Sequence, residues 1–84
     1  MECFAEIRGI IAKELSLEEK LVVPEAHIQD DLGADSLGLF NLAEAISLRY
    51  GIELPMDDLA EMENVQELTK LIESRISSKA RREV

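Results

Sequence analysis

The sequence has no tryptophan, one tyrosine and two phenylalanines in 84 residues. Because hydrophobic residues still make up 46% of it, a folded core must be built from aliphatic side chains, as in a small helical bundle. The single cysteine, Cys3, excludes an internal disulfide and fits a reducing, cytoplasmic environment. We expect Cys3 to lie on an apolar helix face as a small buried hydrophobic side chain.

Long hydrophobic runs are missing too. No stretch of about eighteen apolar residues exists, which excludes a transmembrane helix. The first residues lack the basic and apolar regions of a signal peptide, so we expect no membrane insertion. A chain of 84 residues makes one domain, whose core is too small to enclose a multi-residue active site with its substrate.

Basic residues are scarce in the middle of the chain. Between Glu25 and Glu67 there are eleven acidic residues and one basic residue, Arg49, within a chain whose total charge is −9. Such a segment repels nucleic acid and anionic membranes and attracts proteins with basic patches. The alternative is that the acidic residues form a well-solvated surface that binds no partner. Residues 68–84 are basic instead, with five bases against two acids.

Residues suited to catalysis or metal binding are few. His27, the only histidine, has no second histidine or cysteine near it, so we interpret it as a loop histidine rather than a base or zinc ligand. The acidic clusters around Asp30 and Asp57 lack the spacing of a calcium-binding EF-hand, and neither common phosphate-binding glycine motif is present. Asp35 beside Ser36 has no histidine or lysine to complete a triad. We therefore predict a protein that is not an enzyme and holds no metal ion.

Apolar residues at helical spacing predict an all-α fold, a small antiparallel bundle of three main helices plus one short helix. The long connection between the first two helices is rich in leucine, isoleucine and valine, so we expect it to pack across the bundle. Residues 1–77 are expected to form the domain, and residues 78–84 a polar, basic tail. The helices are expected at residues 2–15, 36–50, 56–60 and 65–77, and the connection at residues 16–34.

Local signals mark the helix ends. Asp35 is a good N-cap for the second main helix, and Gly51 suits a left-handed residue at its end. Asn64 and Glu67 resemble a capping pair that opens the last helix. Gly33 is expected to take a positive φ in the turn before the second main helix.

Residues 31–39, Asp-Leu-Gly-Ala-Asp-Ser-Leu-Gly-Leu, are the most informative segment. They set one serine, Ser36, at the point where an acidic loop gives way to an amphipathic helix. A residue in the first turn of a helix lies beside unpaired N–H groups and the positive end of the helix dipole. Ser36 is therefore well placed to hold a phosphate ester.

The run from Gly33 to Leu37 resembles the attachment motif of acyl carrier proteins, and the resemblance extends over residues 2–77. It implies that Ser36 carries 4′-phosphopantetheine, installed from coenzyme A by a phosphopantetheinyl transferase (holo-acyl carrier protein synthase). It also implies a monomer that delivers thioester-bound acyl groups to acyltransferases, ketosynthases or acyl carrier protein ligases in fatty acid, lipid or polyketide synthesis. The partner-binding face that it implies on the second main helix comprises Asp35, Leu37, Leu39, Phe40, Asn41 and Glu44.

The second main helix departs from that of a typical fatty-acid carrier. Gly38 and Asn41 stand at positions that are usually acidic, and Ser-Leu-Arg at residues 47–49 replaces an acidic run. Leu39 and Phe40 add two large apolar groups close to the serine. We therefore expect a specialised carrier; the alternative is an unmodified acidic helical module that binds a protein partner. A cleft for linear acyl chains is expected among some of Ile28, Leu42, Ile46, Leu59 and Leu68.

Overall fold

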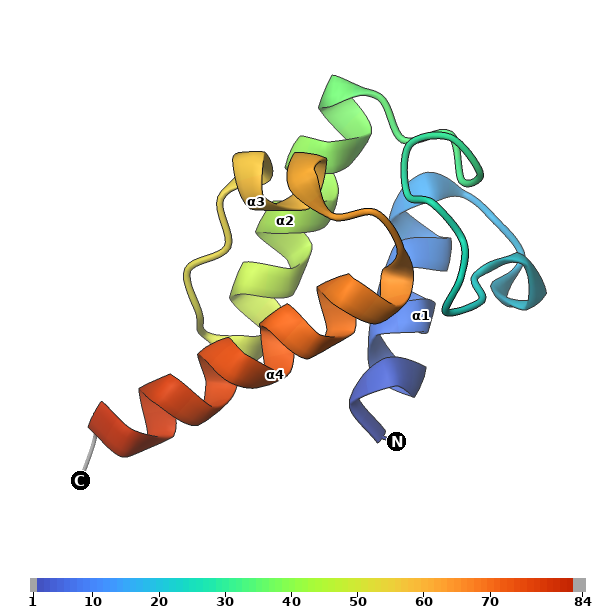
Figure 1. The fold of residues 1–84 in the computed structure, drawn as a ribbon. Helices are drawn as coiled ribbons and strands as arrows, with labels where there is room; N and C mark the ends of the chain where they lie inside the picture. Colours follow the sequence, from blue (N-terminus) through green and yellow to red (C-terminus); the bar gives the residue numbers. More distant parts are fainter. Residues whose placement is uncertain (1, 83–84) are drawn as a thin grey trace.

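The computed structural model describes residues 2–82, with the side chains of residues 4–79, and all regular structure in this part of the chain is helical (Figure 1). The all-α prediction of three main helices and one short helix is therefore confirmed; one 3₁₀ turn, η1, is added. The side chain of Cys3 lies outside the described residues. The elements are α1 (Glu2–Leu15), η1 (Glu19–Leu21), α2 (Ser36–Tyr50), α3 (Met56–Glu61) and α4 (Val65–Arg82).

The core is aliphatic, as the composition predicts. The three long helices, α1, α2 and α4, each bury residues three or four positions apart, which is the spacing that keeps side chains on one side of a helix. Burial of one such side chain contributes about 1.5–3 kcal/mol. The largest fully buried side chains are Ile7 and Ile11 of α1, Leu42 and Ile46 of α2, Leu59 of α3, Val65, Leu68 and Ile72 of α4, and Val22 and Ile28 of the connection.

The connection between α1 and α2 belongs to the bundle, as predicted, but not with all of its apolar side chains. Val22, Ile28 and Leu32 are buried, whereas Leu21 is 51% exposed and Val23 is also exposed. Leu21 is the last residue of η1 and Val22 follows it, and of these three neighbours only Val22 faces the core.

The same connection caps the start of α4. The backbone N–H of Val65 donates to the carbonyl of Ala26 at 3.1 Å, and that of Gln66 donates to the carbonyl of Pro24 at 3.0 Å. The first N–H groups of a helix have no partner within the helix itself. The connection supplies those partners, so it holds α4 in place rather than acting as a free linker.

Side chains complete the cap, and α4 runs further than expected. Asn64 Oδ1 accepts a hydrogen bond from the N–H of Glu67 at 2.9 Å, which confirms the predicted capping pair.

At its other end α4 continues to Arg82, so the expectation that it ends near Ser77 is wrong. Residues 78–82 contain no glycine or proline, and basic residues are favourable at a helix C-terminus, which explains the extension.

Both α1 and α2 are followed by a left-handed residue. Gly51 has a φ of 66° and its N–H donates to the carbonyl of Ser47 at 2.8 Å, as predicted for a helix end. Ser16 adopts a φ of 57° after α1, where the N–H of Leu17 donates to the carbonyl of Ala12 at 2.8 Å. A serine in this conformation is strained relative to glycine.

Candidate functional site

Ser36 is the first residue of α2, and its side chain is exposed. Asp35 precedes it in an extended conformation, and its carboxylate accepts a hydrogen bond from the N–H of Gly38 at 2.8 Å. The carbonyl of Asp35 accepts from the N–H of Leu39 at 2.8 Å. The predicted N-cap is confirmed, and it fixes the start of the helix so that Ser36 occupies the first turn.

Two backbone donors beside Ser36 remain open. Within residues 2–82, the N–H groups of Ser36 and Leu37 have no hydrogen-bond partner, since the cap satisfies the next two amides. Open N–H groups and the positive end of a helix dipole together favour a bound phosphate group. The geometry around Ser36 therefore fits a phosphodiester on its hydroxyl.

The turn before Ser36 is anchored to the core. Gly33 has a φ of 74°, as predicted, and its N–H donates to the carbonyl of Gln29 at 3.1 Å. The N–H of Ala34 donates to the carbonyl of Ile28 at 3.2 Å, and the side chains of Leu32 and Ala34 are buried on either side of the glycine. Ser36 thus projects from a fixed turn.

His27 organises the same loop. Its Nδ1 accepts a hydrogen bond from the N–H of Asp30 at 3.0 Å, and its own N–H donates to Asp31 Oδ2 at 2.7 Å. These bonds fit the interpretation of His27 as a hydrogen-bonding loop residue. Among the described side chains, no group of three or more His, Cys, Asp and Glu residues is arranged to hold a metal ion.

The outward face of α2 is unusually apolar. Leu37 is 67% exposed, Phe40 52% and Leu48 80%, and their spacing places them along one side of the helix. Leu48 was missed by the sequence reasoning, although it lies eleven residues after Leu37 and hence on the same face. Asn41 and Glu44 are exposed beside these side chains.

Leu39 does not belong to this face, which corrects its assignment to the partner-binding residues. It is only 5% exposed and lies in the hydrophobic core with Leu42 and Ile46. Its spacing from these two residues places it on the inner side of α2. Of the adjacent apolar pair at residues 39–40, only Phe40 is available to a partner.

A groove of about 340 Å³ lies between α2 and the segment that leads into α3. Met56, interpreted from the sequence as a core residue, forms part of its wall and is partly buried. Most of the wall is apolar, and Glu44 provides its charged side chain. The lining residues are Phe40, Ala43, Glu44, Ser47, Leu48, Leu54, Pro55 and Met56.

Gly38 has a packing role that its place in the sequence does not reveal. A Cβ atom there would lie 3.1 Å from Leu15 Cδ2 of α1 and 3.4 Å from Asp35 Oδ1. The first distance is tighter than ordinary van der Waals contact, so the Leu15 side chain at the end of α1 would have to shift to admit a larger residue. Close approach to Leu15 is a second reason for a glycine at this position, beside the interpretation of Gly38 as a lost acidic contact on the partner face.

Arg49 is compensated within the molecule. Its Nη2 lies 2.8 Å from Glu6 Oε2 of α1, and the hydroxyl of Tyr50 donates to Glu6 Oε1 at 2.7 Å. The guanidinium also lies 5.5 Å from the centre of the Tyr50 ring. The ion pair between Arg49 and Glu6 thus links α2 to α1.

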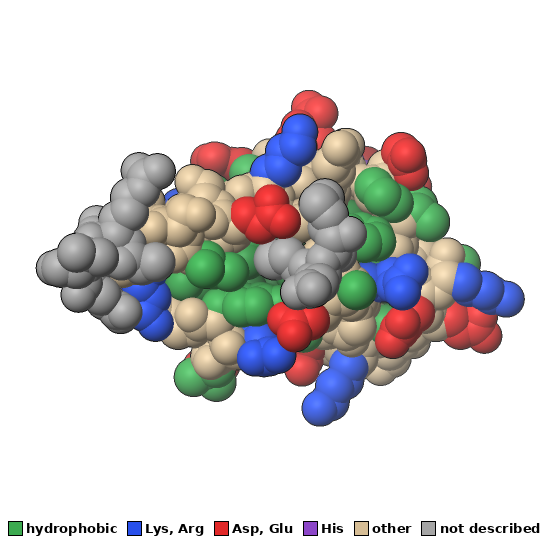
Figure 2. Space-filling model, turned by 90° about the horizontal axis from the view of Figure 1, so that it is seen from below, with side chains coloured by type: hydrophobic (Ala, Val, Ile, Leu, Met, Phe, Trp, Pro, Cys, Tyr) green, Lys and Arg blue, Asp and Glu red, His purple; other side chains and the backbone are tan. Residues whose placement is uncertain are grey.

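Charge is distributed unevenly around the bundle. Asp30, Asp31 and Asp35 are all exposed near the start of α2. Figure 2 views the molecule from below, where the ends of α1 and α4 lie and Lys and Arg side chains are interspersed with Asp and Glu. The Ser36 end is therefore the more suitable one for a partner with basic residues.

Comparisons with known proteins match most of the chain. Residues 5–72 match the family model described as "Phosphopantetheine attachment site". Acyl carrier proteins of Helicobacter pylori strains G27 and HPAG1 are each 37% identical to this chain over 73 residues, which cover 87% of the chain and 94% of each relative. None of the described helices combines the length and hydrophobicity needed to cross a membrane.

Proposed function

Since the chain belongs to the acyl carrier protein family, whose members carry acyl groups on phosphopantetheine and are not enzymes, we propose that Ser36 is the attachment residue. The observation that carries this proposal is the exposed first-turn hydroxyl beside two open backbone N–H groups. The phosphodiester formed on Ser36 Oγ would carry one negative charge. The helix dipole and the open N–H groups of Ser36 and Leu37 favour that charge, although Asp35 is close by.

The test is the intact mass of the protein after incubation with coenzyme A and a phosphopantetheinyl transferase. We expect one arm on the wild-type chain and none on Ser36→Ala. Ser74→Ala, a control at an exposed serine of α4, should be loaded like the wild type. An arm on the Ser36→Ala protein would refute the assignment, and an unmodified wild-type chain would favour the alternative of a protein-interaction module.

We further propose that the outward face of α2 binds the enzymes that load and unload the carrier in fatty acid, lipid or polyketide-type synthesis. Its proposed members are now Asp35, Leu37, Phe40, Asn41 and Glu44, with the apolar groove beside them. Large exposed apolar side chains of this kind mark interaction sites more often than charged ones do. A partner that fits this face presents apolar side chains, with cations opposite Asp35 and Glu44. The apolar part of this face is the basis for proposing a specialised carrier.

This surface is tested by comparing two exposed apolar side chains. Phe40 is 52% exposed on α2, and Leu21 is 51% exposed on the connection. We expect Phe40→Ala to lower kcat/KM of a transferase or ketosynthase for the carrier by about tenfold, the equivalent of one lost apolar contact. Leu21→Ala should leave kcat/KM unchanged. Equal effects of the two substitutions would show that the α2 face is not selectively recognised.

A further inference from the structure

The short helix α3 cannot be stable on its own. It spans six residues, Met56–Glu61, whereas isolated helices shorter than about 12–15 residues are marginal in water. Leu59 is its one buried residue. The position of α3 must therefore be held by contacts with other elements.

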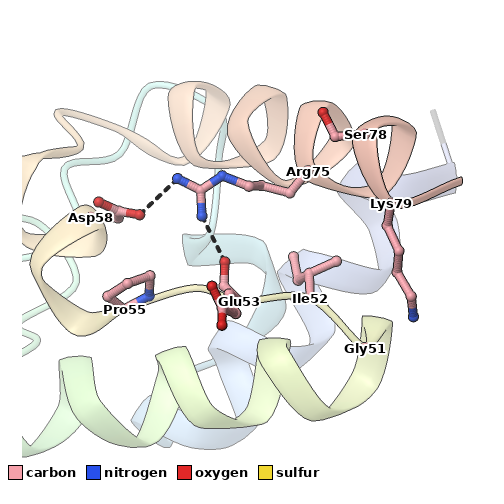
Figure 3. A pocket seen from close by; sticks show the side chains of 8 residues that line it. All are labelled: Gly51, Ile52, Glu53, Pro55, Asp58, Arg75, Ser78 and Lys79. Atoms are coloured by element: carbon pink, nitrogen blue, oxygen red, sulfur yellow. Dashed lines mark hydrogen bonds and ion pairs between the residues drawn. The ribbon is translucent and has the colours of Figure 1, made fainter. Parts of the chain in front are cut away.

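Arg75 of α4 makes two such contacts (Figure 3). Its Nη2 donates to Asp58 Oδ2 of α3 at 2.9 Å, and its Nη1 donates to the carbonyl of Glu53 at 2.6 Å. Glu53 lies in the extended link between α2 and α3, so one guanidinium joins α4 to both the link and α3. We refer to these two bonds as the Arg75 bridge.

The Arg75 bridge lies at the edge of a pocket of about 620 Å³, which is also lined by Gly51, the residue after α2, and by Lys79 of α4. The side chains of Arg75 and Asp58 are 36% and 29% exposed. Water can therefore reach both partners when the bridge breaks, which lowers the cost of opening relative to a buried pair. The bridge is suited to reversible opening.

A weaker bond attaches the other end of α3. Gln29 Nε2, from the connection between α1 and α2, donates to the carbonyl of Ala60 at 3.1 Å. This is a neutral hydrogen bond, whereas the Arg75 bonds are charge-assisted and hence stronger. The Arg75 bridge therefore has a greater effect on the opening equilibrium of α3 than the Gln29 bond does.

We propose that the Arg75 bridge sets the opening equilibrium of α3 and thereby controls access of an acyl chain to the core. When α3 moves outward, Leu59 leaves an aliphatic cluster that includes Leu42, Ile46 and Leu68. The space it vacates is surrounded by aliphatic side chains, which suit a hydrocarbon chain. The part concerning the acyl chain rests on the proposed function, whereas the opening of α3 does not.

The opening is tested on the full, unmodified chain by amide hydrogen exchange. We expect Arg75→Gln to speed exchange in α3 by about fivefold to tenfold, while rates in α1 and α2 keep their wild-type values. Arg75→Lys, which keeps the charge but loses the forked geometry, should have an intermediate effect. The matched control is Arg49→Gln, which breaks an arginine–glutamate pair away from α3 and should leave α3 exchange unchanged.

Two results would overturn the proposal. One is unchanged exchange in α3 of the Arg75→Gln protein; the other is an equal acceleration in all helices, which would indicate a global loss of stability.

Access of the acyl chain is tested separately, on the protein loaded with an octanoyl thioester. Because the open state admits the chain, Arg75→Gln should slow cleavage of the thioester by hydroxylamine about twofold or more relative to Arg49→Gln.

Cleavage that is unchanged or faster would refute control of chain access. Failure of the proposed function would look different, because the wild-type chain would then show no arm by mass. The exchange result for α3 would still stand in that case, and it would decide the first part of the proposal alone.

Discussion

Asp35 combines a structural and a recognition role that substitution can separate. Its carboxylate accepts one hydrogen bond from the N–H of Gly38, at 2.8 Å, in the first turn of α2. Loss of such an N-cap by alanine substitution costs about 0.5–2 kcal/mol. Asparagine keeps the acceptor and loses only the favourable charge at the helix N-terminus, worth about 0.3–1 kcal/mol.

We therefore expect Asp35→Ala to be the less stable variant, by about 0.5–1 kcal/mol relative to Asp35→Asn. For a domain of this size, 1 kcal/mol corresponds to a shift of about 4–8 °C in Tm. Urea unfolding followed by circular dichroism at 222 nm measures the difference. Equal losses for the two variants would refute the reasoning that the hydrogen-bond acceptor, rather than the charge, stabilises the start of α2.

Loading by a phosphopantetheinyl transferase gives the second readout for the same pair. Asp35→Asn keeps the first turn in place but removes a carboxylate from the proposed partner surface. We expect its kcat/KM for loading to fall by about tenfold, mainly through a slower encounter with the basic partner. If Asp35→Asn is loaded with the kcat/KM of the wild type, the Asp35 carboxylate does not belong to the partner surface.

Three further predictions address the core, the helix ends and the surface charge. Leu39→Ala should destabilise the domain by about 2–4 kcal/mol, whereas Leu37→Ala should cost less than about 0.5 kcal/mol; urea unfolding will show whether the two differ. Gly51→Ala should cost about 1 kcal/mol because the left-handed conformation disfavours a side chain, and Ser16→Gly should gain a few tenths; a stabilised Gly51→Ala protein would contradict this. Asn41→Glu should speed elongation by a general fatty-acid ketosynthase if the apolar α2 face reflects specialisation, and unchanged turnover would count against that idea.

Local interactions made most of the fold predictable. The bounds of α1 and α2 follow from apolar spacing together with signals a few residues away, such as Asp35 and Gly51. The pair Asn64 and Glu67 is equally local, since its two members are one helical turn apart. The place of Ser36, the proposed attachment residue, was predictable for the same reason, because it depends on the helix start rather than on distant residues.

Contacts between distant segments were not predictable. Arg49 reaches Glu6 across 43 positions of sequence, so no local pattern shows that its charge is compensated. The limited space beside Gly38 is of the same kind, because it depends on how closely Leu15 of α1 approaches α2. Leu39 was a different error: its spacing indicated the inner face, but its nearness to Ser36 suggested the outer one.

The capping of α4 by the connection has a consequence for how the domain folds. Pro24 and Ala26 supply carbonyls to Val65 and Gln66, some forty positions further along the chain. The first turn of α4 therefore cannot complete its hydrogen bonds until the connection has docked, and the connection gains those bonds only when α4 has formed. The two segments should accordingly form and melt as one cooperative unit, so that an insertion between α1 and α2 would weaken the helix at the other end of the sequence.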